Sequence, residues 1–388
     1  MKPTVLGALA DRRCVRARAL IALSLGLIVS MMLAACGGGG TTPVTGVPLR
    51  ALSDDFNQRK AVAYSPYRTA RNVDELSAEL IPRANIEQDL NLLAAAGFGL
   101  IRTFDSSDKV SRQTLEAIRD LGLDIKMQLG IYVQAGDEAF SQQEIARGVA
   151  LANEFPDIVL AVSVGNETMV SWSFNKIDPD TMARYIGQVR SRVAQPVTTN
   201  DNYAFWAAAP NVITDAVDFV ALHTYPGLDS IFDPGLWDWR QLAVAPEQRA
   251  NAMMDAAIAE ARRQYRLARN HLDRKGLRNL PIVIGETGWN AVDVHPLGQP
   301  FRAHPVNQKM YYDRLQAWVA EGRAGNGPKA IFYFEAFDEP WKQGDDKWGL
   351  FNVERQARYV IQALNPPSAS WVWEPGDYTD GDALYFVP

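Results

Sequence analysis

The chain has 388 residues, of which 47% are hydrophobic and 22% charged, the balance of an ordinary globular protein with a large core. Its net charge is −6 at pH 7, and it falls to about −10 when the first 35 residues, with five basic and one acidic side chain, are left out. An acidic body of this kind argues against nucleic acid or another anionic polymer as the main partner.

The N-terminus predicts export. Five basic residues precede an apolar run from Ala19 to Ala35, as in a secretory signal. The sequence Leu33-Ala34-Ala35-Cys36, followed by four glycines, resembles a bacterial lipobox in which Cys36 is lipidated and becomes the new N-terminus. A transmembrane anchor is the alternative, because 17 apolar residues lie near the lower limit for spanning.

This interpretation divides the chain into three parts. We expect a lipoprotein signal peptide over residues 1–35, a flexible tether over 36–55 and a single folded domain over 56–388. The protein would then be exported and held by its lipid anchor in the bacterial envelope, on the periplasmic or cell-surface side. The choice between inner and outer membrane stays open.

Strands and helices alternate from Lys60 onward. Short apolar runs predict eight strands, at 61–67, 99–104, 124–133, 158–167, 196–200, 217–223, 281–286 and 329–335. Amphipathic spacing predicts the helices between them, at 81–96, 110–121, 141–154, 179–193, 203–209, 247–272 and 305–321. Gly97 and Gly122 follow two of these helices, in the position where glycine commonly ends a helix.

This order predicts a parallel sheet with helical crossovers. Eight such units in about 300 residues fit an α/β fold with one closed (β/α)8 barrel, the TIM barrel. An open doubly wound sheet is the alternative, but no Gly-x-Gly-x-x-Gly follows the first strand. No internal linker interrupts the run, so we expect one domain.

Two of the predicted strands end in a glutamate. The apolar stretch 158–164 leads into Gly165-Asn166-Glu167, and 281–284 leads into Gly285-Glu286. A carboxylate at the tip of an apolar strand is costly unless it is solvated, hydrogen-bonded or used in chemistry. One such glutamate is readily a structural acid. Two of them form the arrangement that a glycosidase with a carboxylate pair requires.

In a barrel, the carboxyl ends of the strands and the loops after them build one face. The other polar or aromatic residues at these positions include Tyr64, Arg102, Phe104, Asn200, Asp201, His223, Tyr225, Trp289, Glu335, Phe337, Asp338 and Glu339. Any one of them can be a satisfied structural group, and we favour that interpretation for Gln128 and Thr199. The convergence of the whole set indicates a site.

These strand ends resemble those of glycoside hydrolase family 17, the β-1,3-glucanases and related glucanosyltransferases. The resemblance runs from Tyr64 to Phe351 and rests on five motifs in order: Ile101-Arg102-Thr103-Phe104, Val164-Gly165-Asn166-Glu167, His223-Thr224-Tyr225-Pro226, Gly285-Glu286-Thr287-Gly288-Trp289 and Phe334-Glu335-Ala336-Phe337-Asp338-Glu339-Pro340-Trp341-Lys342. The chain looks more like the bacterial and fungal branches, because plant members tend to carry Asn at the position of Asp338 and to lack the Pro-Trp before the lysine.

The resemblance implies a retaining glycosidase that cleaves β-1,3-glucan, with Glu167 as general acid/base and Glu286 as nucleophile. In a retaining mechanism the two carboxyls lie about 5–5.5 Å apart, so an ionised Glu286 favours the protonated form of Glu167. Arg102 would keep Glu286 ionised through a charge-assisted hydrogen bond. Asn166 would bind the 2-hydroxyl of the sugar.

Further substrate contacts are expected from the same strand ends. Glu339 and Lys342 match positions where the family keeps a Glu and a Lys near the acid, and His223, Glu335, Phe337 and Asp338 complete the polar and aromatic set. The residues expected to stack on sugar rings are Tyr64, Phe104, Tyr225, Trp289 and Trp341.

Three other functions stay open. A transglycosylase uses the same carboxylates with another glucan as acceptor, and Trp237-Asp238-Trp239 would then form acceptor subsites. A non-catalytic glucan-binding surface lipoprotein is disfavoured, because both carboxylates are present. A barrel glycosidase acting on mannans or β-1,4-glucans is disfavoured by the five motifs in series.

Cofactors are not expected. The four histidines do not form a ligand cluster, so we expect no metal, and no Gly-x-Ser-x-Gly elbow indicates an esterase. The expected partners are a β-glucan polysaccharide or oligosaccharide and, through Cys36, a membrane. We expect a monomer.

Overall fold

The computed structural model describes residues 48–294, 303–325, 327–345, 347–364, 371–376 and 378. The expected signal peptide, the lipidation site at Cys36 and the tether up to residue 47 lie outside the described residues. Within the described part of the chain, no helix combines the length and apolar character needed to cross a membrane.

The described end of the expected tether, 48–55, is already part of the barrel unit. The backbone N–H of Arg50 donates to the buried Asp218 at 2.9 Å. Ser53 accepts a hydrogen bond from the first turn of helix α1 (Asp54–Gln58) and so caps it. The boundary expected at residue 56 is therefore too late, because the chain is fixed to the fold by residue 50.

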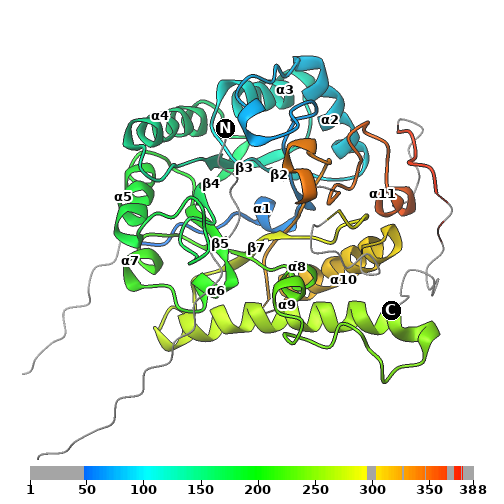
Figure 1. Ribbon diagram of the computed structural model, residues 1–388. Coiled ribbons are helices and arrows are strands. Elements are labelled where there is room, and N and C mark those ends of the chain that lie inside the picture. Colours follow the sequence, from blue (N-terminus) through cyan, green and yellow to red (C-terminus); the bar gives the residue numbers. More distant parts are fainter. Residues whose placement is uncertain are drawn as a thin grey trace, which may run out of the picture. The chain divides into compact units, whose positions relative to one another are not determined.

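Eight parallel strands close into one barrel in chain order, with β8 paired to β1 (Figure 1). The predicted TIM barrel is thus confirmed. The strands are β1 (Ala61–Ala63), β2 (Leu100–Arg102), β3 (Lys126–Ile131), β4 (Val159–Asn166), β5 (Val197–Asn202), β6 (Val220–His223), β7 (Ile282–Thr287) and β8 (Ile331–Tyr333).

Helices follow the strands around the outside of the barrel (Figure 1). They are α2 (Arg83–Ala95), α3 (Gln113–Leu121), α4 (Glu138–Glu154), α5 (Pro179–Arg190), α6 (Tyr203–Trp206), α7 (Asn211–Thr214), α8 (Pro226–Phe232), α9 (Arg249–Arg274), α10 (Pro305–Ala324) and α11 (Tyr359–Ala363). Short 3-10 helices occur at Val73–Glu75 (η1), Pro246–Gln248 (η3) and, with a kink, Pro340–Asp345 (η5), and a π-helical turn occurs at Asp108–Arg112 (η2).

Local chemistry explains where helices begin and end. Helix α3 ends at Gly122, whose left-handed φ of 62° suits glycine, as the sequence predicts. Helix α4 begins three residues before the predicted position because Asp137 caps it by accepting from Phe140 N–H. Helix α5 combines an Asp178 cap with Pro179 in its first turn.

The amino-terminal end of the barrel is closed by apolar rings. Helix α1 inserts the fully buried Phe56 between Phe219 and Phe332, with ring centroids 6.1 and 6.0 Å away. A separate and larger apolar cluster fills the space between the strands and the outer helices. Because all eight strands are parallel, their polar carboxyl-terminal tips gather at the other end.

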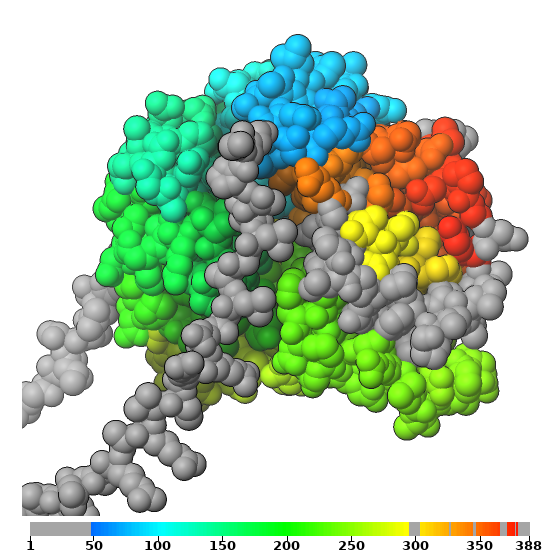
Figure 2. Space-filling view, in the orientation of Figure 1, coloured from blue at the N-terminus to red at the C-terminus, as the bar shows by residue number. Residues whose placement is uncertain are grey.

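The loop after β8 packs beside the loop after β1, although the two are far apart in sequence. Figures 1 and 2 show this orange segment beside the blue one. Gln343 donates its side-chain amide to the carbonyl of Arg71 at 3.2 Å, which ties η5 to the segment before η1. The residues of the fifth motif therefore lie over the carboxyl end of β1.

Candidate active site

Glu167 and Glu286 lie on either side of one histidine at the carboxyl end of the barrel. His223 at the end of β6 has its Nδ1 2.9 Å from Glu167 Oε1 and 3.5 Å from Glu286 Oε2. The two carboxylate oxygens are therefore separated by less than the sum of these distances. That limit admits the separation of about 5–5.5 Å between the carboxyl groups of retaining glycosidases.

Glu286 is held as a carboxylate. Arg102 donates from Nη1 to Oε1 of Glu286 at 2.6 Å, and the hydroxyl of Tyr225 donates to Oε2 at 2.8 Å. Burial alone raises the pKa of Glu286, but His223, Arg102 and the two hydrogen bonds outweigh it, so the pKa lies below its usual range. A buried, ionised and fully oriented carboxylate is suited to nucleophilic attack.

Glu167 has a more open environment. Its side chain is 34% exposed, against 7% for Glu286. Its backbone is in the left-handed region, with φ of 49°, just after Gly165 with φ of 79°, while its N–H still donates to Asn200 O at 2.9 Å. Such a conformation costs about 1–3 kcal/mol in a non-glycine residue. The turn moves the glutamate out of the strand and beside His223.

Asn166 is oriented by the same arginine that holds the buried carboxylate. Arg102 donates from Nη2 to Asn166 Oδ1. It donates from Nη1 to both Glu286 and the carbonyl of Gly285. The carbonyl oxygen of the Asn166 amide is thereby directed at Arg102, so its Nδ2 is the group that can donate to a ligand. One guanidinium fixes two neighbouring site residues.

A second charged cluster follows β8. Lys342 is bonded through Nζ to both Glu335, at 2.6 Å, and Glu339. Burial raises the pKa of Glu335 well above its usual range, and the nearby Glu339 adds to the effect. Burial also acts to raise the pKa of Glu339, but Lys342 and hydrogen bonds lower it to about 2. The cluster thus holds one lysine, one carboxylate and one neutral acid.

Aromatic rings connect the two clusters. Lys342 lies 4.2 Å from the ring centroid of Phe334, which meets the rings of Tyr225 and Phe104 at 5.9 and 6.4 Å. Phe104 and Phe334 are half-buried, as is Trp341, whose indole N–H donates to Glu339 at 2.9 Å. Phe334 belongs to the site, although sequence reasoning assigned it no role.

Three of the expected stacking residues are buried: Tyr225, which donates to Glu286, and the almost inaccessible Tyr64 and Trp289. Tyr64 is 1% exposed, and its hydroxyl donates to Asp89. Trp289 is also 1% exposed, with its ring 5.3 Å from that of Tyr311, and its backbone N–H donates to the hydroxyl of Tyr333. Neither ring faces solvent in this structure, so the arrangement supports packing roles for both rather than sugar stacking.

Two residues of the fifth motif hold the fold together. Phe337 stacks on Phe351 with centroids 5.2 Å apart. Asp338 is fully buried and accepts from both guanidinium nitrogens of Arg358, at 2.8 and 2.7 Å, and from Gly349 N–H. These contacts fasten the loop after β8 and leave no polar atom of Asp338 directed at a ligand.

Asp201 is a further residue near the acid, to which the sequence analysis gave no role. It follows Asn200 in β5, and its Oδ2 accepts from the backbone N–H of Met169, two residues after Glu167. Burial raises its pKa to about 7 against the lowering effect of its backbone hydrogen bonds, and the charge of Glu167 raises it further. Its position in the strand-end set was readable from sequence, but its burial was not.

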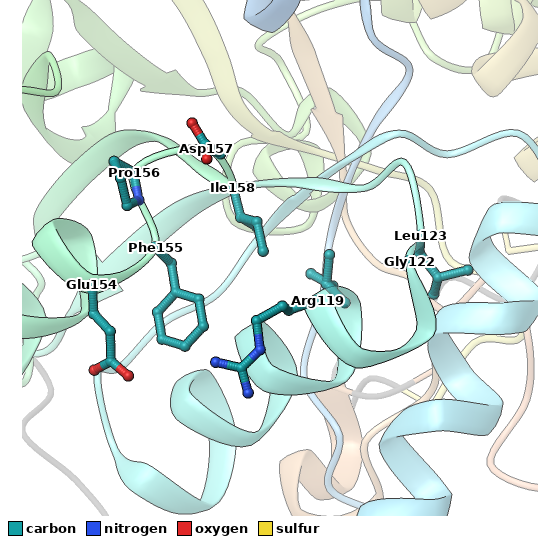
Figure 3. Close-up of a pocket in the computed structure, with 9 residues that line it drawn as sticks. Arg119, Gly122, Leu123, Glu154, Phe155, Pro156, Asp157 and Ile158 are labelled. Carbon is teal, nitrogen blue, oxygen red and sulfur yellow. The ribbon is translucent and has the colours of Figure 1, made fainter.

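Other parts of the described chain do not compete with this site. No group of three or more His, Cys, Asp or Glu side chains is placed to hold a metal ion within the described residues. The hollow in Figure 3 lies at the opposite end of the barrel, where α3 and α4 end and β3 and β4 begin. It is lined by Ile118, Arg119, Gly122, Leu123, Glu154, Phe155, Pro156, Asp157 and Ile158.

Solved structures resemble the whole barrel. An endo-laminarinase from Formosa Hel1_33_131 has a TM-score of 0.69 and 27% sequence identity, over 79% of this chain and 86% of that one. A glycoside hydrolase family 17 β-1,3-glucanosyltransferase from Rhizomucor miehei matches with a TM-score of 0.52 and 19% identity, over 81% and 98% of the two chains. The second likeness shows the fold alone.

Fungal proteins resemble the chain in sequence. A glucan 1,3-beta-glucosidase from Arthroderma benhamiae is 25% identical over 291 residues, 71% of this chain and 84% of the relative. A probable glucan endo-1,3-beta-glucosidase btgC from Aspergillus clavatus is 25% identical over 297 residues, but the match spans only 38% of that longer protein.

The family comparison covers the barrel from its first strand to beyond the fifth motif. The model described as the BtgE/BtgC glycoside hydrolase domain matches residues 61–356. The resemblance to glycoside hydrolase family 17 predicted from the strand-end motifs is confirmed. Because the match covers well over half of its length, the chain belongs to the BtgE/BtgC glycoside hydrolase family.

Proposed function

We propose that this protein is a retaining glycosidase that cleaves β-1,3-glucan through a covalent glycosyl-enzyme. The proposal rests on the positions of Glu167 and Glu286, whose carboxylates lie 2.9 and 3.5 Å from the same nitrogen, Nδ1 of His223. Glu286 is buried and ionised, and Glu167 is partly exposed. The β-1,3 linkage is supported by the endo-laminarinase and the fungal glucan 1,3-beta-glucosidases that the chain resembles.

In the first step, Glu286 attacks the anomeric carbon while Glu167 protonates the leaving oxygen. Arg102 and Tyr225 hold the attacking oxygens in place, so little reorganisation is needed as the bond forms. Asn166 Nδ2 is available to donate to a sugar hydroxyl, a contact that strengthens in the transition state.

In the second step, Glu167 has lost its proton and acts as a base. It removes a proton from the incoming acceptor, which attacks the glycosyl-enzyme and releases Glu286. Water as acceptor gives hydrolysis, and a glucan hydroxyl gives transglycosylation. Both outcomes use the same residues, so the acceptor is decided by what binds beside Glu167.

Product analysis tests the proposal. Laminari-oligosaccharides of defined length are incubated with the protein starting at residue 48, with Glu286→Gln as the blank, and the products are separated by length. Shorter products that are absent from the blank support hydrolysis, and longer ones in addition support transfer. A folded protein that leaves every oligosaccharide intact but cleaves β-1,4-glucans or mannans would contradict the proposed linkage.

We also propose that the protein is an exported lipoprotein, anchored through Cys36. The support is the sequence alone: a basic segment, an apolar run and Leu33-Ala34-Ala35-Cys36 before four glycines. Expression of the full chain in a bacterium, followed by mass spectrometry, should find diacylglycerol on Cys36 and no residues before it. An unmodified Cys36 in a shorter or intact chain would contradict the anchor.

A further inference from the structure

Two large aromatic side chains stand in solvent on the catalytic face. Trp172 is 62% exposed and Phe174 is 98% exposed. They follow Glu167 by five and seven residues, in the loop between β4 and α5. Exposed rings in a loop that follows a strand end of the candidate site indicate a ligand surface, because covering them removes apolar area from water.

The loop that carries these rings is held at both ends. At its base, Ile177 N–H donates to Thr168 O at 2.8 Å, which closes a compact ten-residue loop. Met169, in the same base, is buried, and its N–H is bonded to Asp201 at 2.8 Å. The rings are therefore presented on a fixed support.

The far side of the loop is fastened to the segment after β3. The buried side chain of Asn175 accepts from Ala135 N–H at 2.7 Å and donates to Val133 O at 2.8 Å. Asn175 directly follows Phe174 in the chain. A ring on rigid backbone loses little conformational freedom when it binds, so its exposure favours recognition.

The position of the loop indicates which part of the substrate its rings can contact. Glu286 attacks the sugar that stays on the enzyme, and Glu167 protonates the oxygen that leaves with the rest of the glucan. The loop continues directly from Glu167, so it borders the leaving side. We propose that Trp172 and Phe174 form a stacking platform for sugar units on the leaving-group side, and hence for acceptor glucans. This inference rests on the proposed glycosidase function.

The loop expected to hold acceptors does not offer such a surface. Trp239 is 4% exposed, and Trp237 is half-buried with its indole N–H donating to the carbonyl of Pro226 at 2.9 Å. Their rings contribute to the apolar core. The exposed rings of Trp172 and Phe174 are therefore more accessible to a glucan than the rings of Trp237 and Trp239.

The test compares a leaving group made of sugar with one that contains none. Trp172→Ala and Phe174→Ala are assayed on laminari-oligosaccharides of increasing length and on an aryl β-laminaribioside. The apolar area of one ring predicts a loss of roughly tenfold in kcat/KM per ring on the long oligosaccharides. The loss on the aryl glycoside should be much smaller, and Trp172→Phe should recover most of the activity on oligosaccharides.

Leu121→Ala is the matched control. Leu121 is 40% exposed at the end of α3, at the opposite end of the barrel. Its truncation to alanine should leave kcat/KM unchanged on both substrates. Equal losses on both substrates, or no loss on either, would overturn the platform while the wild-type protein still cleaves glucan. A wild-type protein that cleaves neither substrate would refute the proposed function itself, which distinguishes the two failures.

Discussion

At the scale of single residues, burial and hydrogen-bond partners set the ionisation of Glu286 and of its donor Tyr225. Glu286 accepts from Arg102 and Tyr225 and is ionised, while burial and the charge of Glu286 raise the pKa of Tyr225 well above its usual range. Tyr225 therefore stays protonated and donates throughout the working pH range. The nucleophile depends on these two donors and on His223 for its low pKa.

Arg102→Met should shift the pH dependence of activity. The loss of a cation 2.6 Å from Glu286 raises the pKa of that carboxylate, so the acidic limb of kcat/KM should move to higher pH. The substitution also leaves the Glu286 carboxylate buried without its cation, which should cost about 3–5 kcal/mol of stability. Tyr225→Phe removes a neutral donor and should move the limb less. If the acidic limb of kcat/KM lies at the same pH in Arg102→Met as in the wild type, Arg102 does not control the ionisation of Glu286.

The Lys342 cluster predicts unequal effects from two similar substitutions. Glu335 is buried and its pKa is raised, so Glu335→Gln replaces a neutral acid with a neutral amide and should change the free energy of unfolding by less than about 1 kcal/mol. Glu339→Gln removes the carboxylate that pairs with Lys342 and should cost about 3–5 kcal/mol. Urea denaturation at pH 7 measures both, and a larger cost for Glu335→Gln would reverse the assignment of the proton.

At the scale of elements, packing explains one glycine within β7 and one directly after it. A Cβ on Gly285 would lie 2.4 Å from Asn200 Oδ1, and one on Gly288 would lie 2.0 Å from the backbone oxygen of Phe334. The motif Gly-Glu-Thr-Gly-Trp therefore combines one catalytic candidate with two glycines that let neighbouring strands approach closely.

Gly288→Ala should destabilise the protein, and Gly187→Ala should stabilise it. The first substitution collides with backbone and should cost about 1–3 kcal/mol, because neither strand can move freely. Gly187 lies on the exposed face of α5 with nothing within 4 Å of a new Cβ, so alanine should add about 0.5–1 kcal/mol. Thermal melting of the two variants gives the comparison, and similar melting temperatures would show that β7 yields to the methyl group.

The order of elements was predictable from sequence, but the burial of strand-end aromatics was not. Apolar runs and helix-ending glycines such as Gly122 are local signals, and they located the barrel. Tyr64 and Trp289 stand at strand ends like true site residues, yet other loops cover them. Gly227 in α8, for example, approaches the ring of Trp289 so closely that a Cβ there would lie 3.1 Å from it. Such coverage depends on distant segments.

The residues of the candidate site also divide into those that the sequence identified and those that it did not. Glu167, Glu286 and Arg102 were placed together from their strand positions, because the carboxyl ends of parallel strands meet at one face. Trp172 and Phe174 could not be identified, since their residue types are common in cores and only the folded loop leaves them exposed. Exposure is a tertiary property that no local pattern encodes.

At the scale of the whole molecule, two buried aspartates couple stability to pH. Burial raises the pKa values of Asp201 and Asp229 to about 7, whereas an unfolded aspartate titrates near 3.9. The folded state thus binds more protons between pH 4 and 7, and their stabilising contribution is complete below about pH 4 and lost as the pH rises through 7. Glu286 and Glu339 oppose this only at more acidic pH, because their pKa values are lowered.

The protein should therefore unfold less readily at pH 5.5 than at pH 8. Each aspartate contributes a slope of at most about 1.4 kcal/mol per pH unit. The double variant Asp201→Asn with Asp229→Asn should make the profile of unfolding free energy less steep between these values. Glu335 and Asp105, whose pKa values are also raised by burial, contribute in the same direction. A wild-type profile that rises from pH 5.5 to 8 would contradict the protonation of both aspartates.

The barrel as a whole has one apolar end, closed by Phe56 and α1, and one polar end, where Glu167 and Glu286 meet. A trapped intermediate tests the central claim at this polar end. A laminaribiosyl fluoride with fluorine at carbon 2 reacts with a retaining nucleophile and is released slowly, because the fluorine destabilises the oxocarbenium-like transition state. Peptide mass spectrometry then locates the bound sugar. We expect one glycosyl group on Glu286. A label on another residue, or turnover of glucan with inversion at the anomeric carbon, would contradict the assignment of Glu286 as the nucleophile.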